Sequence, residues 1–240
     1  MRIGIIAALP AELKPLVKGW KRVKTSSPRT YKWTRRCGED EWVAVCAGMG
    51  AAAALRSFAE AEHDGALDMV LSVGWVGALH NEVRAGTAQV PTVVIDSQTG
   101  EQFSLTQGKR KWRLVTTQRV ADSKEKARLA ATYPGAGLVD MEAATVARLA
   151  AMREIPLLCI KGVSDAADAT LPDLNPFIDR MGQMKMLPFL ASIALRPRYW
   201  SPLAHLGRNS ARAAIAMRNL IFEFMEEKNV DKLIRSGSVQ

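Results

Sequence analysis

The sequence contains few cysteines, and their spacing excludes two common ways of stabilising a small protein. Among 240 residues only Cys37, Cys46 and Cys159 are cysteines, and no Cys-x-x-Cys pair occurs. This set cannot supply a disulfide framework, and its spacing argues against a structural zinc site. We therefore expect a reduced, cytoplasmic protein.

Long apolar runs are also absent. No stretch approaches the roughly 18 consecutive apolar residues that a membrane-spanning helix requires, and the run 143–151 is interrupted by Arg148. The apolar run near the N-terminus is too short for the core of a secretory signal peptide. These absences argue against a membrane-spanning or secreted protein.

Two nucleotide-binding signatures are missing as well. The glycines follow neither the G-x-G-x-x-G pattern with a ribose-binding acid nor the G-x-x-x-x-G-K-[ST] pattern. These patterns mark dinucleotide and P-loop sites, so both functions are excluded.

The composition that remains is that of a folded, basic protein. Hydrophobic residues make up 48% and charged residues 24% of the chain, which is the ordinary range for globular domains. Lysine and arginine number 33 against 24 aspartate and glutamate, giving a formal charge of +9. Such a surplus favours anionic partners, but no motif that reads DNA or RNA is present, so we expect no nucleic-acid function.

Apolar runs alternate with helical patterns along most of the chain. We expect strands at 2–8, 41–47, 68–73, 88–96, 113–117, 138–141 and 156–161, and helices at 10–19, 51–63, 123–133 and 142–153. The segment 21–36 is expected to form a loop with one exposed strand. Alternating strands and helices predict a three-layer α/β/α fold around a central mixed β-sheet.

Polar or glycine-bearing turns are expected directly after five of these strands, at 8–12, 48–50, 74–77, 141–142 and 164–165. Ligand sites in open α/β sheets lie at the carboxyl ends of strands, so these turns could form one site. Each turn also has a purely structural interpretation. The glycines could simply make tight turns, and the acidic residues and Ser164 could cap helices.

Five sequence segments, taken in order, favour a functional site at these turns over a purely structural role. MRIGIIAALPAEL, CAGMGAAAA, SVGWVGAL, VDMEAATVARLA and KGVSDAAD resemble the purine nucleoside phosphorylase/nucleosidase family, and most closely its 5′-methylthioadenosine/S-adenosylhomocysteine nucleosidase branch. The resemblance extends from residue 1 to about residue 190. The VDMEA and SDAAD segments are its most specific part.

The resemblance implies a role for each matching residue. Asp165 corresponds to the acid that protonates N7 of the purine, and Ser164 to the residue that orients it. Glu142 matches the glutamate that binds the ribose hydroxyls, and Met141 the methionine beneath the sugar. Glu12 matches the glutamate that activates water. This chemistry is reasonable, because a protonated purine is a better leaving group and a second carboxylate can accept a proton from water.

The remaining expected substrate-binding residues are Gly48, Gly74, Trp75, Gly77, Val120 and Lys161. Val120 ends the segment 118–120, which falls where the family's base-pocket strand lies. Lys161 stands where the family usually has arginine. Trp75 replaces a small hydroxyl residue and would crowd the phosphate or water pocket, or wall off the sugar.

The nucleophile is predicted from what the N-terminal segment lacks. Phosphorylases of the family carry GDPxR there to bind phosphate, whereas this chain has AALPAEL. We therefore expect hydrolysis of a purine nucleoside, such as a 5′-substituted adenosine. The resemblance implies that this reaction needs neither a metal nor an organic cofactor. A phosphate-dependent phosphorylase is the first alternative. A non-catalytic nucleoside-binding or membrane-peripheral protein, with Trp75 closing the nucleophile site, is the second.

The C-terminal part differs in composition from the rest. We expect a catalytic domain over 1–194 and a basic helical extension over 195–240, because 196–218 contains five arginines and no acidic residue. This region resembles the hopanoid-associated nucleosidase-like branch, whose substrate is an adenosylated lipid. A solvated helix face, a contact within a homodimer or higher oligomer, and a helix at an anionic membrane surface all fit this composition.

Overall fold

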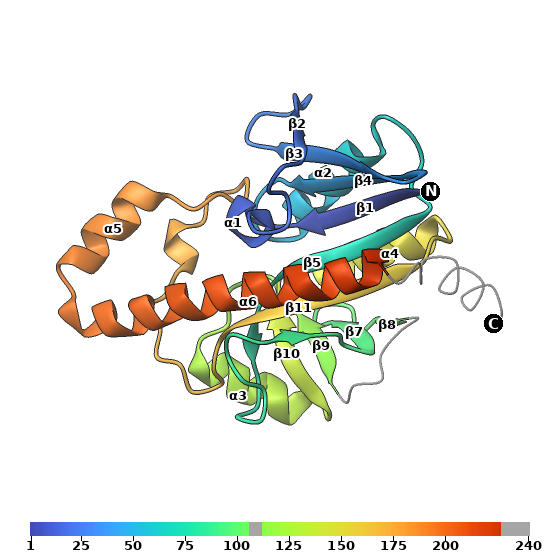
Figure 1. The fold of residues 1–240 in the computed structure, drawn as a ribbon. Helices are drawn as coiled ribbons and strands as arrows, with labels where there is room; N and C mark the ends of the chain where they lie inside the picture. Colours follow the sequence, from blue (N-terminus) through green and yellow to red (C-terminus); the bar gives the residue numbers. More distant parts are fainter. Residues whose placement is uncertain (106–111, 227–240) are drawn as a thin grey trace.

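A computed structural model describes residues 1–105 and 112–226. One large mixed sheet runs through it (Figure 1). Its strands are β1 (Arg2–Ala7), β2 (Lys21–Val23), β3 (Tyr31–Cys37), β4 (Asp40–Cys46), β5 (Met69–Ala78), β6 (Ala88–Gln89), β7 (Val93–Asp96), β8 (Gln102–Ser104), β9 (Arg113–Thr116), β10 (Ala136–Asp140) and β11 (Leu157–Asp165). The helices are α1 (Pro10–Leu13), α2 (Ala51–Glu62), α3 (Ser123–Thr132), α4 (Ala143–Met152), α5 (Met186–Ala194) and α6 (Trp200–Glu226), with short 3₁₀ turns at Asn175–Phe177 and Pro197–Tyr199.

The sheet has the order β2-β3-β4-β1-β5-β10-β9-β7-β8, and β11 pairs with β5 and β6. Strands β1, β4, β5 and β11 are mutually parallel, whereas β10 is antiparallel to β5. The predicted mixed α/β sheet is therefore confirmed.

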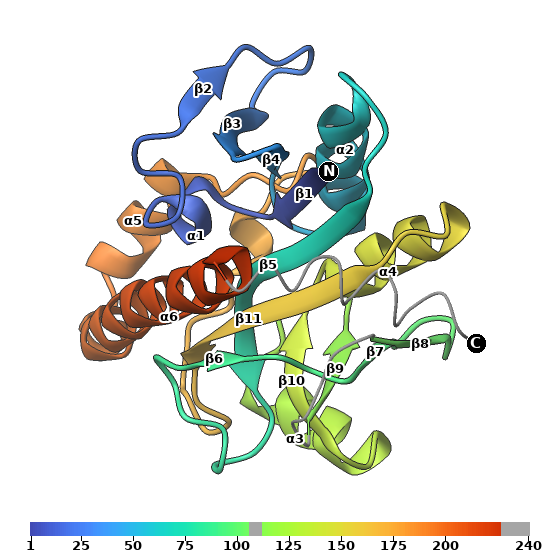
Figure 2. The same cartoon turned by 45° about the vertical axis from the view of Figure 1, so that its right-hand side comes forward.

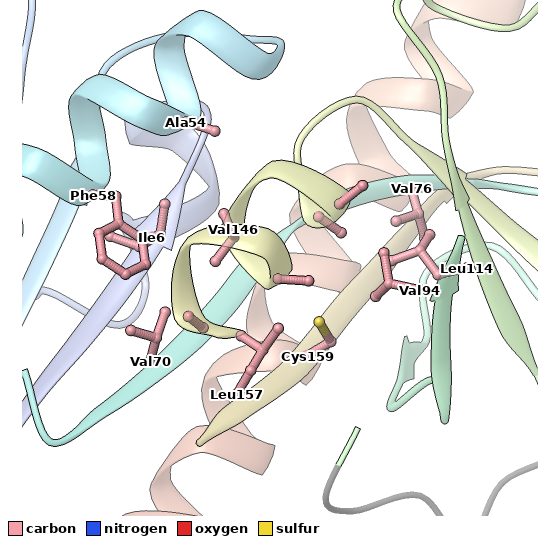
Figure 3. Packing of buried hydrophobic residues seen from close by; sticks show 14 of the residues in the cluster. Ile6, Ala54, Phe58, Val70, Val76, Val94, Leu114, Val146, Leu157 and Cys159 are labelled. Atoms are coloured by element: carbon pink, nitrogen blue, oxygen red, sulfur yellow. The ribbon is translucent and has the colours of Figure 1, made fainter. Parts of the chain in front are cut away.

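Helices cover both faces of the sheet (Figure 2). On one face, α6 packs against β5, β6 and β11, and its Ala214, Met217, Ile221 and Phe224 belong to the core on that side. The other face is covered by α2 and α4, whose side chains form a second core with the sheet (Figure 3). Because α6 supplies part of the first core, the basic segment expected to be an extension contributes to the main fold. Residues 227–240 of that segment lie outside the described residues.

Three predicted elements were wrong, each for an identifiable reason. The helix expected over 10–19 ends at Leu13, because Pro15 lacks the N–H that would continue it. The expected turn at 74–77 is instead the end of β5, because the β11 ladder continues alongside it through Gly162 and Val163. The strand expected over 88–96 is divided into β6 and β7 at Pro91.

Among the residues that the structure describes, no helix is both long enough and apolar enough to cross a bilayer.

Candidate functional site

Three strands meet at Gly77, and this junction organises the candidate site. Gly77 of β5 is the register partner of both Val139 in β10 and Asp165 in β11. The carboxyl ends of β10 and β11 therefore lie on either side of the same strand. The sequence does place polar side chains here, but Ser164 and Asp165 end a strand instead of capping a helix.

Glu12, in helix α1, is buried next to the C-terminal end of β1. Its Oε2 accepts hydrogen bonds from the backbone N–H groups of Ala8 at 2.9 Å and Leu9 at 2.8 Å, and its Oε1 accepts one from Trp75 at 2.8 Å. A carboxylate offers about four acceptor positions, so one position on Oε1 remains. Burial raises the pKa of Glu12 above its ordinary value, although the three N–H groups favour the charged form.

At the start of α4, the carboxylates of Asp140 and Glu142 bind different backbone N–H groups. Asp140 accepts from the backbone N–H of Ala143 at 3.0 Å, which satisfies the helix terminus. Glu142 is consequently not needed as a cap, and its Oε1 accepts instead from the N–H of Gly50 at 2.6 Å. Burial and the negative charge of Asp140 raise the pKa of Glu142 to about 8.

Lys161 lies in the interior and neutralises Asp140. Its ammonium is 2.9 Å from Asp140 Oδ2 and donates to Ser72 Oγ at 3.0 Å, and the residue is 1% exposed. Burial alone would lower the pKa of Lys161, but the adjacent Asp140 carboxylate outweighs it and the pKa is raised. The positive charge of Lys161 therefore compensates the buried carboxylate of Asp140.

Asp165 is held by one hydroxyl and one cation. Ser164 Oγ lies 2.5 Å from Asp165 Oδ1 and 3.1 Å from the carbonyl oxygen of Val76. On the other side, the ammonium of Lys126 in α3 pairs with Oδ2 of Asp165 and donates to the Ala166 carbonyl at 2.6 Å. The carboxylate is thus fixed in position and charge-paired.

Two glycines of β5 leave room for these carboxylates. A Cβ at Gly74 would lie 3.2 Å from Glu12 Oε1, and one at Gly77 would lie 3.3 Å from Asp165 Oδ2 and 2.9 Å from Lys126 Cε. Close approach to a polar side chain, and not a turn, is therefore the structural reason for both glycines.

The two glycines of the Gly-Met-Gly segment at 48–50 contact different parts of the chain. Gly48 has a φ of 113° and approaches the segment 181–183, where its own Cβ would lie 2.9 Å from the carbonyl oxygen of Gly182. Gly50 instead faces the VDMEA segment: its N–H binds Glu142, and its Cβ position is 3.8 Å from Met141 Cε. Gly50, which was not among the expected site residues, is the member of this turn beside Glu142 and Met141.

Trp75 contacts the site through its main chain. Its backbone N–H binds Glu12, whereas its indole Nε1 donates to the carbonyl oxygen of Ser210 in α6 at 3.0 Å. The ring packs against the core beneath α6. The indole is thus directed toward α6, whereas the sequence had suggested that it would crowd a water or phosphate pocket or wall off the sugar.

The backbone of Val120 is occupied by an amide side chain. Its N–H donates to Asn175 Oδ1 at 2.9 Å, and its carbonyl accepts from Asn175 Nδ2 at 3.1 Å. Asp173 Oδ1 also accepts from Asn175 Nδ2, at 2.8 Å, which fixes the orientation of the amide. Because the N–H and C=O of Val120 face the same partner, this backbone can bind a planar group that carries a hydrogen-bond acceptor next to a donor.

A cavity of about 430 Å³ lies beside this pair and is lined by Ser97, Gln98, Thr117, Gln118, Arg119, Val120, Asp122, Glu125, Asp173 and Asn175. Glu12, Glu142 and Asp165 are not in its walls. The cavity therefore adjoins the Val120 end of the candidate site. In the described part of the chain, no group of three or more His, Cys, Asp or Glu side chains is arranged to hold a metal ion.

The sequence matches the model of the phosphorylase superfamily over residues 2–111 and 112–187. The chain belongs to this superfamily. No curated protein sequence matches it.

Solved structures of superfamily nucleosidases share its fold. The 5′-methylthioadenosine nucleosidase of Arabidopsis thaliana has a TM-score of 0.70 at 17% identity, with 96% of this chain and 98% of that one covered. A mutant of the Helicobacter pylori MTAN with 5′-methylthioadenosine in its active site has a TM-score of 0.67 at 15% identity, covering 92% and 98%. The futalosine hydrolase of the same organism has a TM-score of 0.66 at 15% identity, covering 93% and 98%.

Two residues of the candidate site carry no signal in the sequence. Lys126 is one of two lysines in a polar helix, and only the fold shows that it is 2% exposed and directed at Asp165. Asn175 follows a proline-containing loop and looks like an ordinary turn residue. Neither could be found from spacing, because each meets its partner through tertiary contact.

Proposed function

We propose that the protein is a nucleosidase that hydrolyses the N-glycosidic bond of a purine nucleoside of the 5′-substituted adenosine class. The observation that carries this proposal is the arrangement of two separate carboxylates around β5. Glu12 lies beside Gly74, and Asp165 lies beside Gly77 of the same strand. Cleavage of this bond needs an acid at the leaving base and a base for the attacking water.

Asp165 is the proposed acid at N7 of the purine: its carboxylate, which is ion-paired with Lys126 in the free protein, takes up a proton when the nucleoside binds and passes it to N7. Ser164 and Lys126 hold its two oxygens, so the carboxyl group is positioned before the substrate arrives. As the bond breaks, negative charge develops on the base. A proton or a strong hydrogen bond from this side stabilises that charge, and the neighbouring cation adds to the effect.

Glu12 is the proposed base. Its one remaining acceptor position on Oε1 suits a single water molecule, which would be held by a group already fixed by three backbone N–H donors. Burial moves the pKa of Glu12 upward, toward the pH at which a base works most efficiently.

Glu142 is the proposed ribose-binding residue, with Met141 packing beneath the sugar. A carboxyl with a pKa of about 8 carries its proton for much of the time at neutral pH. It can then donate one hydrogen bond to a sugar hydroxyl and accept another, which a fully charged carboxylate cannot do.

The backbone of Val120 is the proposed contact for the base. Its N–H and C=O pair matches the N1 acceptor and the 6-amino donor of adenine. A 6-oxo purine presents the reverse pattern, a donor at N1 and an acceptor at O6, and would leave both backbone groups without a partner. This pattern favours adenine nucleosides.

Base release from a panel of purine nucleosides tests the proposal. The wild-type chain and the Asp165→Asn variant would be compared on 5′-methylthioadenosine, adenosine and inosine, with and without phosphate. We expect release of adenine that does not depend on phosphate, little from inosine, and about 10²-fold slower turnover in the variant. Phosphate-dependent release would indicate the phosphorylase, and no release from any nucleoside would indicate a non-catalytic binding protein.

A further inference from the structure

Helix α5 and the beginning of α6 form a hairpin that projects from the body of the molecule (left in Figure 1). One face of this hairpin is packed: Phe189 is 8% exposed and meets the ring of Phe177 edge-on at 5.4 Å between centroids. The other face is open. Its large apolar side chains are strongly exposed, namely Met186 (52%), Leu187 (82%), Leu190 (54%), Leu195 (86%) and Trp200 (55%).

Basic residues surround these apolar side chains. Lys185 precedes α5, and Arg196 and Arg198 follow it; all three are exposed. No aspartate or glutamate occurs anywhere from residue 180 to residue 222. In the parts of the chain that the structure describes, neither Arg196 nor Arg198 forms an ion pair, and the guanidinium of Arg198 lies 4.8 Å from the ring of Tyr199. We name this surface, made by Lys185, Met186, Leu187, Leu190, Leu195, Arg196, Arg198 and Trp200, the hairpin face.

We propose that the hairpin face docks on an anionic lipid bilayer. Apolar side chains with tryptophan at one end and a rim of cations, of which Arg196 and Arg198 have no acidic partner among the described residues, are the combination that inserts at the boundary between headgroups and acyl chains. The leucines would enter the acyl region, while Lys185, Arg196 and Arg198 would contact lipid phosphates. An exposed apolar area that carries only positive charge fits no ordinary solvated helix face.

The charge pattern argues against a second copy of the chain as the occupant. In a two-fold symmetric contact through this face, Arg196 and Arg198 would approach the same cations of the other copy. No acidic residue within the hairpin face is present to compensate them, and like charges brought together weaken an interface.

Docking would bring the candidate site close to the membrane. The segment that leads into α5 is joined to the Gly-Met-Gly turn: the N–H of Met49 donates to the Gly182 carbonyl at 2.8 Å, and Gln183 Nε2 donates to the Ala47 carbonyl at 2.9 Å. The hairpin is therefore fixed to the same turn that contacts Glu142.

Co-sedimentation with lipid vesicles tests the proposal without requiring any enzymatic activity. The full chain would be mixed with vesicles of phosphatidylcholine alone or of phosphatidylcholine with phosphatidylglycerol. We expect binding only to the anionic vesicles, with an affinity that falls steeply as salt shortens the Debye length from about 10 Å at 0.1 M to about 3 Å at 1 M.

Two variants and one control separate the apolar and charged contributions. Leu187→Ser combined with Leu190→Ser, and Arg196→Glu combined with Arg198→Glu, should each weaken vesicle binding at least tenfold. Met152→Ser is the matched control, because Met152 is 73% exposed at the end of α4, outside the hairpin face; it should bind as the wild type does. All of the changed residues are exposed, so circular dichroism should show unchanged folding.

Three results would overturn the proposal. The first is an absence of wild-type binding to anionic vesicles at low salt. The second is a shift from dimer to monomer in the leucine variant without any vesicle binding by the wild type, which would make the face a contact between copies. The third is a lack of specificity: equal retention of all three variants on vesicles would place vesicle binding outside the hairpin face, and equally tight binding to a nucleic-acid duplex would indicate charge attraction alone.

Discussion

The ammonium of Lys126 and the carboxylate of Asp165 form an ion pair in the interior of the protein, with side chains that are 3% and 13% exposed. The two groups come from elements far apart in the sequence, helix α3 and the end of β11. Gly77 makes this contact possible, because any side chain there would press on both partners. The pair links the position of the proposed acid to the packing of α3.

Removal of the Lys126 ammonium should lower the free energy of unfolding strongly only while Asp165 is charged. Lys126→Met should lower the free energy of unfolding by about 3–5 kcal/mol, because it leaves a carboxylate in the interior without its cation. The same change made in an Asp165→Asn background should cost much less. Chemical denaturation of the four chains gives the coupling energy. Equal costs in both backgrounds would show that Lys126 acts through packing alone.

Glu12→Gln tests the proposed base. The amide has nearly the shape of the carboxylate but cannot accept a proton, so turnover should fall by about 10²-fold or more. Substrate affinity, measured by calorimetry, should change little because the base and ribose contacts remain. Thermal unfolding serves as the folding control. Turnover within a few-fold of the wild type would reduce Glu12 to a structural residue that organises three backbone N–H groups.

Glu142 should make the protein less stable as the pH rises. Its pKa increases from about 4.5 in the unfolded chain to about 8 in the folded one. The folded state therefore holds a proton that the unfolded state has lost, and this stabilisation is complete below pH 4.5 and disappears as the pH approaches 8. Glu142→Gln should flatten the decline. Denaturation series between these pH values would show it, and an unchanged slope in the variant would contradict the assignment.

Asn175 should compete with the substrate for Val120. Its amide occupies both backbone groups that the proposed base contact requires, so it must leave before adenine can dock. Each hydrogen bond contributes about 0.5–1.5 kcal/mol net, so Asn175→Ala should lower KM for 5′-methylthioadenosine several-fold with little change in kcat. Initial-rate kinetics would measure both constants. A higher KM would show instead that Asn175 itself helps to hold the substrate.

The sequence allowed the fold to be predicted well where local pattern and tertiary packing agree. The C-terminal ends of three strands, at Ala7, Cys46 and Asp140, lie within one residue of the predicted ends. In the sequence, these ends are marked by buried apolar runs that are followed by turns. The prediction failed at Gly74–Gly77, where glycines that suggested a turn instead allow side chains to approach a strand. Local pattern cannot distinguish these two uses of glycine.

The candidate site shows the same division. Glu12, Glu142 and Asp165 could be selected from the sequence because each lies in a motif that resembles the family. Lys126 and Asn175 could not, because their partners are 39 and 55 residues away in the chain and no local pattern records the contact. The orientation of the Trp75 indole is likewise set by its bond to Ser210, which only the folded arrangement of α6 provides.

The sugar product formed in excess phosphate tests the central claim most directly. The wild-type chain would be given 5′-methylthioadenosine with phosphate present, and the products would be identified by mass spectrometry. Hydrolysis with Glu12 as the base predicts free 5-methylthioribose and adenine in equal amounts, with about 10²-fold less of each from Glu12→Gln on the same timescale. Accumulation of the sugar 1-phosphate would contradict the account and assign the protein to the phosphate-dependent members of its superfamily.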